Sequence, residues 1–319
     1  MKETVIKKDI LSSEGITVLS LFDGISCGRI ALERAGIKVK EYYASEIKKI
    51  AITVTMSHYP DTIQIGDVTK VHYKNGILYT ENGNYNVGKI DLLIGGSPCQ
   101  NFSLARATDK LSIDGLDGDK SKLFYEYLRI KKECNPEYFL LENVKMKSES
   151  EKELNTYMGV NGLHINSSLV SFQNRPRIYW TNIPNVTLPK DKQINFQDFK
   201  DKDFNYCNQF KLPDTPSRRK YWRNGNGNNS ATGGCKNITY AKKTQTITRK
   251  QDRCPNSGLI EFDGFCRFLT RREIELAQTL PVGYTDLLSY NQMQDVCGDG
   301  WTVDVIAHIF KGLKLNQKK

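Results

Sequence analysis

Cys99 is the side chain best placed for covalent chemistry. It lies in GGSPCQNFS (residues 95–103), a Gly-rich turn that follows an apolar run. A cysteine thiol becomes a good nucleophile once its proton has been removed, and the backbone amides of such a turn could face the sulfur. We expect the other seven cysteines to be inert buried residues. The Ser-Pro context and the position of the turn favour a nucleophile at Cys99.

Acidic and basic side chains that could assist a nucleophile follow later in the chain. Glu142 closes the apolar run YFLL and can donate a proton or a hydrogen bond to a ring nitrogen, although a solvated acid at a strand end fits the same pattern. Arg175 and Arg177 are two residues apart on the extended segment QNRPRIYW, which places both on one face of a strand. Their guanidinium groups can bind a carbonyl oxygen and a phosphate, or form a salt bridge with a nearby acid.

A glycine turn predicts a nucleotide-like ligand. Asp23, Gly24 and Gly28 lie in DGISCG, which follows the apolar run ITVLSLF. Glu46 comes 22 residues after Gly24, where an acid can accept both hydroxyl groups of a ribose. Asp67, in GDV, could bind the amino group of an adenine. The turn departs from the dinucleotide fingerprint and contains an acid but no Lys or Arg, which favours S-adenosylmethionine over NAD or ATP.

Alternating strand-like and helix-like segments must position these residues. The expected strands are 16–22, 41–45, 90–94 and 138–141, and the expected helices are 29–36, 47–58, 120–134, 270–280 and 301–313. Such alternation predicts an α/β fold with a mostly parallel, Rossmann-like sheet that has helices on both faces and binds ligands at the carboxyl ends of its strands. Two Asn-Gly pairs between residues 71 and 89 predict a hairpin that decorates this sheet.

Residues 183–267 differ in character from the rest of the chain. They are rich in Pro, Asn and Gly and include the low-complexity stretch NGNGNNSATGGC (224–235), for which we expect flexibility. We therefore expect residues 1–182 and 268–319 to form one domain, whose final helix returns to the N-terminal part. Residues 183–267 interrupt it as a smaller, irregular, partly β domain.

The positive charge of the chain is concentrated in this second region. The net charge is +10, and residues 211–253 contain eleven Lys and Arg against two acids, a net charge of +9. The same segment contains Tyr221 and Trp222. A concentrated basic surplus beside aromatic residues predicts contact with phosphates and base edges.

Composition excludes several other classes of protein. The 319 residues are 39% hydrophobic and 26% charged, as in ordinary globular proteins. The eight cysteines form no CxxC or CxxH pair, so we expect free thiols and neither a zinc site nor a redox dithiol. The N-terminus lacks the apolar stretch of a signal peptide, and no window is long and apolar enough to span a membrane. We expect an intracellular protein, cytoplasmic or nucleoid-associated.

The order of these motifs resembles that of the DNA cytosine-5 methyltransferases. The series is LFDGISCG, Glu46, GDV, GGSPCQNFS, ENV, QNRPR, RFLTRREIELAQTLP and GDGWTVDVIAHIF. The resemblance covers nearly the whole chain except about residues 184–240, and its most specific elements are Pro-Cys, Glu-Asn-Val and the paired arginines. Four segments are most similar in sequence to the animal de novo methyltransferases: SLFDGI, ASEIKKIAITVTM, QTIT and GYTD. We expect a bacterial or phage member of the family.

The resemblance implies a fold and a role for each matching residue. The sheet would be that of an S-adenosylmethionine-dependent methyltransferase, and residues 183–267 would be its target-recognition region. Cys99 would be the nucleophile, Glu142 would engage ring nitrogen 3 of cytosine, Arg177 would bind its carbonyl oxygen, and Arg175 would support the catalytic loop. The cofactor residues that it implies, with Glu46 on the ribose and Asp67 and Val68 on the adenine, are Phe22, Asp23, Gly24, Ile25, Gly28, Glu46, Ile47, Asp67, Val68, Gly96, Leu123, Gly300 and Trp301. The DNA contacts that we expect are Ser97, Gln100, Arg218, Arg219, Lys220, Arg223, Lys242, Lys243 and Arg249.

The sequence departs from the family pattern in two places. Lys120-Ser121-Lys122-Leu123 stands where Arg-Gly-x-Leu is usual, and Asp299-Gly300 stands where Asn-Ser or Arg-Ser is common. The second departure leaves the cofactor contacts of the last glycine turn open, including those of a modified methyl donor.

The implied function is methylation of carbon 5 of a cytosine flipped out of double-stranded DNA, with a covalent Cys99 adduct at carbon 6. The polar loop 100–119 would close over the base. One branch of the family, to which a Cys-Phe-Thr signature in the recognition region belongs, methylates transfer RNA. This chain lacks that tripeptide. A catalytically silent DNA-binding paralogue would have lost the nucleophile or the glycine turn, and both are present. The sequence leaves open the recognition site, the existence of a cognate restriction endonuclease and the oligomeric state.

Overall fold

The computed structural model describes residues 15–97, 122–223, 236–252 and 255–316. Its largest element is a seven-stranded sheet with the strand order β3-β2-β1-β7-β8-β10-β9. The strands are β1 (Ile16–Leu21), β2 (Val39–Ser45), β3 (Ile63–Gln64), β7 (Leu92–Gly96), β8 (Tyr138–Val144), β9 (Leu163–Asn166) and β10 (Pro176–Thr181). Neighbouring strands are parallel from β3 to β8, and β10 is antiparallel to both β8 and β9. This arrangement confirms the predicted mostly parallel α/β sheet.

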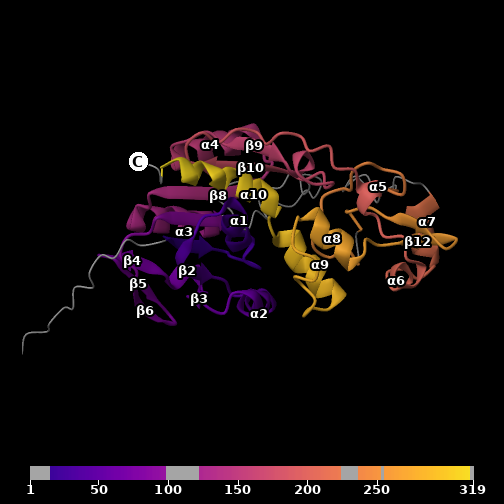
Figure 1. The fold of residues 1–319 in the computed structure, drawn as a ribbon, viewed down its shortest axis with the longest axis horizontal. Helices are drawn as coiled ribbons and strands as arrows, with labels where there is room; N and C mark the ends of the chain where they lie inside the picture. Colours follow the sequence, from indigo (N-terminus) through magenta and orange to yellow (C-terminus); the bar gives the residue numbers. More distant parts are fainter. Residues whose placement is uncertain (1–14, 98–121, 224–235, 253–254, 317–319) are drawn as a thin grey trace, which may run out of the picture.

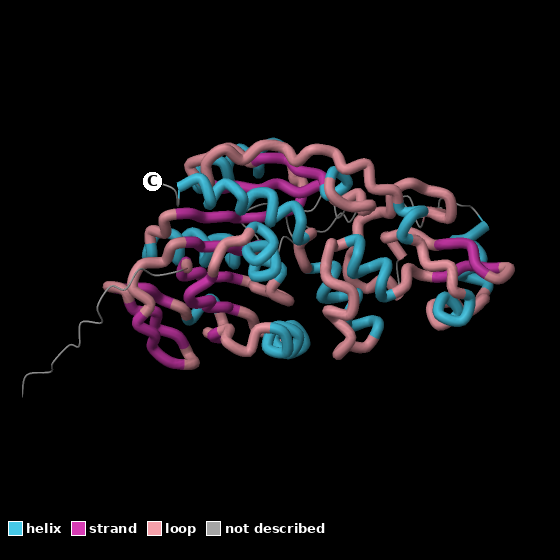
Figure 2. The backbone as a smooth tube through the Cα atoms, in the orientation of Figure 1, coloured by secondary structure: helices cyan, strands magenta, loops and turns pink. Residues whose placement is uncertain are grey.

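Helices cover both faces of the sheet, as Figures 1 and 2 show. On β1, for example, Val18 belongs to one hydrophobic cluster and Leu19 to the other, because successive residues of a strand point to opposite faces. The first cluster includes residues of α1 (Cys27–Ala35), α2 (Lys49–His58), α9 (Tyr290–Asp299) and α10 (Val303–Phe310). The second includes residues of α3 (Lys122–Cys134) and α4 (Ser148–Met158). Helix α10 contacts α1, which brings the end of the chain next to its N-terminal part.

The predicted elements are present with small shifts of their ends. Helix α1 begins two residues earlier than expected and α2 two residues later, whereas α8 (Arg271–Ala277) is shorter than the expected helix 270–280. Strand β8 continues to Val144, so Glu142 lies inside the strand and pairs with Tyr179, instead of following it. The sequence patterns missed α4, α9 and β9 because their apolar periodicity is interrupted by polar residues.

The predicted hairpin is a small three-stranded antiparallel sheet. It consists of β4 (His72–Lys74), β5 (Ile77–Thr80) and β6 (Gly83–Asn86), in that order. The turn between β4 and β5 is the Asn75-Gly76 pair, whose φ angles of 52° and 82° match the two-residue hairpin turn that such pairs favour. Figure 1 shows this small sheet beside β2 and β3.

The described part of the chain between β10 and α8 is irregular and has only short elements (Figure 2). These are α5 (Phe196–Phe199), α6 (Phe204–Asn208), α7 (Pro216–Arg223), β11 (Ile260–Phe262) and β12 (Phe265–Arg267). The content agrees with the expected irregular, partly β character, while the domain boundaries at 182 and 268 stay a prediction. The low-complexity stretch 224–235 lies outside the described residues.

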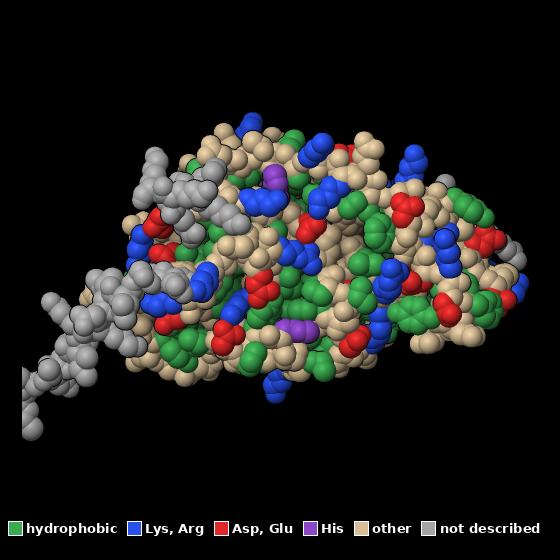
Figure 3. Space-filling model, viewed as in Figure 1, with side chains coloured by type: hydrophobic (Ala, Val, Ile, Leu, Met, Phe, Trp, Pro, Cys, Tyr) green, Lys and Arg blue, Asp and Glu red, His purple; other side chains and the backbone are tan. Residues whose placement is uncertain are grey.

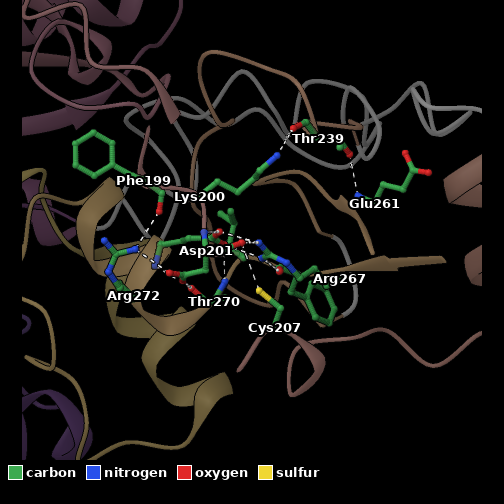
Figure 4. Close-up of polar contacts among 12 residues, drawn as sticks. Phe199, Lys200, Asp201, Cys207, Thr239, Glu261, Arg267, Thr270 and Arg272 are labelled. Atoms are coloured by element: carbon green, nitrogen blue, oxygen red, sulfur yellow. Dashed lines mark hydrogen bonds and ion pairs between the residues drawn. The ribbon is translucent and has the colours of Figure 1, made fainter. Parts of the chain in front are cut away.

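A buried ion pair joins this irregular part to α8. Both guanidinium nitrogens of Arg267 lie 2.8 Å from the carboxylate of Glu273, and the two side chains are 2% and 0% exposed. Glu273 also completes a capping box with Thr270 at the start of α8, and Thr270 donates a hydrogen bond to Asp201. Figure 4 shows Arg267, Thr270 and Arg272 gathered around Asp201. Burial makes such a pair costly to break from one side, so it holds segment 199–201 and β12 on α8.

No helix of the described residues is long and apolar enough to cross a membrane. On the face seen in Figure 3, basic side chains are interspersed with acidic ones over the whole molecule, and no large patch of one sign stands out.

Candidate active site

The carboxyl ends of four neighbouring strands bring the predicted residues together. In the register of the sheet, Leu21 of β1 pairs with Ser45 of β2 and with Gly95 of β7, and Gly96 pairs with Glu142 of β8. The glycine turn, Glu46 and Glu142 therefore lie along one edge of the sheet, although 119 positions separate Asp23 from Glu142.

The turn after β1 is shaped by backbone conformation. Phe22, Gly24 and Ser26 have φ angles of 57°, 62° and 56°, so the chain reverses within five residues before α1 begins. The left-handed region suits Gly24 and costs the other two residues conformational energy.

Asp23 stabilises this turn from inside. Its carboxylate accepts hydrogen bonds from the hydroxyl groups of Ser20, Ser26 and Tyr42. Burial raises the pKa of Asp23 above its ordinary value, and the three hydroxyl donors oppose that rise. The carboxylate is thus used by the turn itself. Its acidity is a weaker argument for a cationic ligand than the sequence suggested.

Glu46 is fixed by backbone amides. Its Oε2 accepts from the amide of Gly24 at 2.9 Å, and its Oε1 accepts from the amides of Ile47 and Lys48 at 2.8 and 2.9 Å. The Ile47 side chain beside it is 70% exposed, which is unusual for a large apolar residue. A carboxylate next to an exposed apolar side chain suits a ribose with a stacked base.

Asp67 and Val68 lie beyond β3, at the start of a short 3-10 helix (Val68–Lys70). Asp67 Oδ1 accepts from the amide of Thr69 at 2.9 Å, and its second oxygen accepts no hydrogen bond within the described part of the chain. The hydroxyl group of Ser45 donates to the carbonyl of Gly66 at 2.7 Å, so the loop before Asp67 is joined to the residue before Glu46. Val68 is buried under the loop.

Glu142, Arg177 and Trp301 form a compact polar group. Glu142 Oε1 lies 2.9 Å from Arg177 Nε, and Glu142 Oε2 accepts from Trp301 Nε1 at 3.1 Å. Glu142 is 8% exposed. A β-carbon on Gly96 would lie 2.7 Å from Trp301 Nε1 and 2.9 Å from Glu142 Oε2, so only glycine fits between them. Both carboxylate oxygens are therefore held in place.

Arg175 has different partners from Arg177. It precedes β10, is 3% exposed, and donates to the carbonyl oxygens of Ile247, Gly298 and Gly300 at 2.7, 3.0 and 2.8 Å. The two arginines thus do not converge on one ligand as a strand face would suggest. Arg177 contacts Glu142, and Arg175 ties the segment around Ile247 to the last glycine turn.

The last glycine turn, Gly300-Trp301, follows α9 and lies close to the first one. A β-carbon on Gly28 would lie 2.5 Å from Ile94 Cδ1 and 3.5 Å from the Trp301 ring, so the first turn of α1 packs tightly on β7 and Trp301. Asp299, the unusual residue of this turn, forms ion pairs with Lys48 at 2.5 Å and Arg249 at 3.7 Å. Its charge is therefore matched locally. Leu123 is half-buried at the start of α3 against the second hydrophobic cluster.

The described cysteines agree with the expectation of inert thiols. Cys27, Cys134, Cys207, Cys266 and Cys297 are free and buried. Burial raises the pKa of Cys27, which lies in the glycine turn, to about 12, so this thiol stays protonated near neutral pH. Cys99 and Gln100, with the loop 100–119, lie outside the described residues. Ser97, two residues before Cys99, is 3% exposed and accepts from Asn143 Nδ2 at 3.3 Å.

The basic residues that we expect to contact DNA lie on α7 and between residues 242 and 249. Arg218 and Arg219 lie on α7, where Arg219 forms an ion pair with Asp214, and the side chains of Lys220 and Arg223 lie outside the described part. Lys242 and Arg249 are exposed. The ammonium group of Lys243 donates to the carbonyls of Ser168 and Ser171 at 2.7 and 2.9 Å, so it already has acceptors within the fold.

Sequence reasoning missed several supporting residues. Tyr284 donates from its hydroxyl group to the carbonyl of Ile25 at 2.8 Å, and its ring stacks on His58 at 4.0 Å. Tyr42 and Ser20 lie within the predicted strands and orient Asp23, a role that the strand pattern does not indicate. No spacing rule finds them, because these contacts join residues that are distant in the chain. Only Tyr284, in the GYTD motif, had a signal.

Comparison with known proteins agrees with this geometry. The family model of the C-5 cytosine-specific DNA methylases matches residues 16–315. The orphan methyltransferase M.Rho11sI of Bacillus phage rho11s is 30% identical over 194 residues, which are 56% of this chain and 35% of the phage protein. DNA (cytosine-5)-methyltransferase DRM2 of Arabidopsis thaliana is 39% identical over 120 residues, 36% of this chain and 18% of the plant protein. The chain thus spans only part of these two relatives, and its similarity to the animal subgroup stays a prediction.

Solved structures of similar fold cover nearly the whole chain. The Entamoeba histolytica methyltransferase EhMeth superposes with a TM-score of 0.71 at 16% identity, covering 96% of this chain and 99% of that one. A DNA modification methyltransferase, described as putative and encoded within an E. coli prophage, superposes with a TM-score of 0.65 at 17% identity, covering 96% and 100%. At such identities the likeness shows the fold alone. The match of the family model over residues 16–315 shows more: this chain belongs to the C-5 cytosine-specific DNA methylases.

Proposed function

We propose that this chain transfers the methyl group of S-adenosylmethionine to carbon 5 of a cytosine flipped out of duplex DNA. The observation that supports this best is the position of Glu142. Its two oxygens are held by Arg177 Nε and Trp301 Nε1, at the sheet edge where the glycine turn and Glu46 also lie. An acid and a guanidinium group side by side suit the ring nitrogen 3 and the carbonyl oxygen of cytosine.

The residues at the other end of this edge fit S-adenosylmethionine. Glu46 is an acceptor for ribose hydroxyl groups, Ile47 is an exposed apolar side chain for one face of the adenine, and Asp67 has a carboxylate oxygen for its amino group. Gly28 packs on Ile94 and Gly96 packs on Trp301, so closely that neither position has room for a side chain. When bound, the cofactor supplies an electrophilic methyl group on a sulfonium. No Lys or Arg in the turn competes with that charge.

The protein side of the chemistry can be assigned to named residues. Carbon 5 of cytosine is a weak nucleophile, so the thiolate of Cys99 adds to carbon 6 and makes carbon 5 reactive. Glu142 donates a hydrogen bond to ring nitrogen 3, where negative charge develops during this addition, and Arg177 binds the carbonyl oxygen. After carbon 5 has accepted the methyl group, loss of the carbon 5 proton to a base breaks the bond between carbon 6 and Cys99, which releases the methylated cytosine and the free thiolate. Arg175 contributes without touching the base, because it holds the last glycine turn and the segment at Ile247 together.

The distribution of positive charge along the chain suits duplex DNA as the substrate. Residues 211–253 supply most of the net charge of the chain, and Lys242 and Arg249 are exposed there. A stacked base is inaccessible to a buried carboxylate such as Glu142, so the target cytosine must leave the helix to react.

The test begins with cells that express the protein. Bisulfite sequencing of their DNA should show methylated cytosines in one sequence context, which identifies the recognition site. A duplex with 5-fluorocytosine at that site should then form a covalent adduct that resists denaturation and depends on S-adenosylmethionine.

Two variants make this test specific. Cys99→Ala should lose the adduct and the methylation while still binding DNA. Cys134→Ala changes a buried thiol on α3 and should keep both. Methylation by Cys99→Ala would show that another group is the nucleophile. A wild-type protein that methylates nothing and forms no adduct would contradict the proposed activity.

A further inference from the structure

The three-stranded sheet β4–β6 reaches the adenine end of the candidate cofactor site. It is inserted between the loop that contains Asp67 and strand β7, and it is joined to the main sheet through its core. Leu78 of β5 is fully buried in the second hydrophobic cluster, and Tyr85 of β6 contacts the ring of Tyr43 on β2 at 5.7 Å. The small sheet is thus anchored firmly enough to hold another part of the chain.

The tip of this sheet, between β5 and β6, contacts the Asp67 loop in several places. Glu81 Oε1 accepts from the amide of Asp67 at 2.8 Å, and Glu81 Oε2 lies 3.3 Å from Lys70 Nζ. The neighbouring Asn82 donates from Nδ2 to the carbonyl of Gln64 at 3.0 Å. Two consecutive side chains of the tip therefore bind both sides of the loop.

Gly66 shows how closely the two segments approach. A β-carbon at this position would lie 2.3 Å from Glu81 Oε1, and its φ angle of 77° is one that other residues avoid. The backbone conformation favours glycine, and a side chain at this position would push the Glu81 carboxylate away from the Asp67 amide. On the other side, the hydroxyl group of Ser45 donates to the Gly66 carbonyl at 2.7 Å. The loop is held between the end of β2 and the inserted sheet.

These contacts determine where the Asp67 carboxylate points. Its backbone amide is taken by Glu81 and its Oδ1 by the amide of Thr69, which together fix the peptide plane and the side chain. The second oxygen is then directed by the loop and takes no partner among the described residues. Without Glu81 the amide of Asp67 would have to find water, and the loop would lose its link to the inserted sheet.

We propose that Glu81 is a positioning residue for adenine recognition, acting through the backbone of Asp67. The proposal rests on the proposed function, since it assumes that S-adenosylmethionine binds at this edge of the sheet. Glu81 touches no ligand itself. It presets the loop so that Asp67 meets the adenine amino group without a conformational cost at binding.

Direct binding of S-adenosylhomocysteine to the full chain, measured by calorimetry, tests this. Glu81→Ala should weaken binding by about threefold to tenfold, the loss expected from one hydrogen bond. Glu81→Gln keeps an acceptor oxygen for the Asp67 amide and should retain most of the affinity. Lys70→Ala removes the charged neighbour of Glu81 but leaves the amide contact, so it should bind like the wild type.

A second ligand separates positioning from a general structural role. In the analogue that has hydrogen in place of the adenine amino group, the contact with Asp67 is absent. The wild type should therefore discriminate between the two ligands, and Glu81→Ala should discriminate less. Under saturating cofactor the variant should keep its kcat and show a raised KM for S-adenosylmethionine.

The outcomes distinguish the two proposals. A wild-type chain that binds no S-adenosylhomocysteine contradicts the proposed cofactor site. A wild type that binds, with Glu81→Ala showing equal affinity or undiminished discrimination, overturns the role of Glu81 alone. If Glu81→Ala is unfolded, Glu81→Met takes its place, because it keeps the length of the side chain and lacks the acceptor for the Asp67 amide, and Glu81→Gln stays the control that retains the acceptor.

Discussion

Replacing Trp301 by Phe should slow methyl transfer while leaving the fold intact. The substitution keeps an aromatic ring against Gly28 and Gly96 but removes the Nε1 donor that lies 3.1 Å from Glu142 Oε2. Glu142 is 8% exposed, so water does not readily replace this donor. A hydrogen bond to a charged group contributes about 1.5–3 kcal/mol, which corresponds to roughly tenfold to 100-fold in rate. One carboxylate oxygen would lose its restraint, and among the residues that the structure describes Arg177 would be left to orient the group.

The matched control is Trp180→Phe. Trp180 is fully buried on β10 and donates from Nε1 to Asn155 Oδ1 at 2.6 Å, so it loses the same donor and the same ring volume away from Glu142. The assay is the single-turnover rate of methyl transfer at saturating cofactor and DNA, with thermal unfolding measured beside it. Trp180→Phe should lose stability and keep its rate. A Trp301→Phe rate within about twofold of the wild type, or an equal loss in both variants, would refute the role of the indole nitrogen.

Two further predictions concern charge. Neutralising Arg218, Arg219 and Lys220 should weaken DNA binding and lower the slope of log affinity against log salt by up to about 2.7. Neutralising the exposed Lys74, Lys89 and Lys132 should change neither the affinity nor the slope. Unchanged DNA binding by the first variant would remove α7 from the interface. Asp23 binds its proton more tightly in the folded than in the unfolded chain, so the free energy of unfolding should fall as pH rises from the ordinary pKa of 3.8 through the raised folded pKa, and Asp23→Asn should lack this fall. Urea unfolding between about pH 4 and pH 7 checks it, and equal pH dependence in the two proteins would contradict it.

The positions of the strands could be predicted because they are short apolar runs followed by glycine or acidic residues. ITVLSLF, IDLLI and YFLL each form a strand of the sheet, and the residues near their carboxyl ends meet at one edge. What could not be predicted is where a strand stops. The sequence predicts that the strand ends before Glu142, but pairing with β10 continues β8 to Val144, and β10 follows much later in the chain.

The polar contacts of the site were harder to predict than its residues. The type and spacing of Arg175 and Arg177 are the same whether or not they share a ligand. Their separate partners depend on how α9 and the segment around Ile247 pack on the sheet. In the same way, nothing in the sequence of the inserted sheet indicates that Glu81 meets the amide of Asp67, because that contact depends on the orientation of the whole hairpin.

The buried guanidinium group of Arg175 sets a condition for exchanging recognition regions between related enzymes. Its acceptors at Ile247, Gly298 and Gly300 are all main-chain carbonyl oxygens, which are present whatever the side chain. A graft could therefore change the side chains around residue 247 freely. An insertion or deletion there would move the carbonyl away from Arg175 and detach the graft from the last glycine turn. A chimera that keeps residues 244–250 from the recipient should fold with its cofactor site intact, whichever DNA sequence the transplanted part reads.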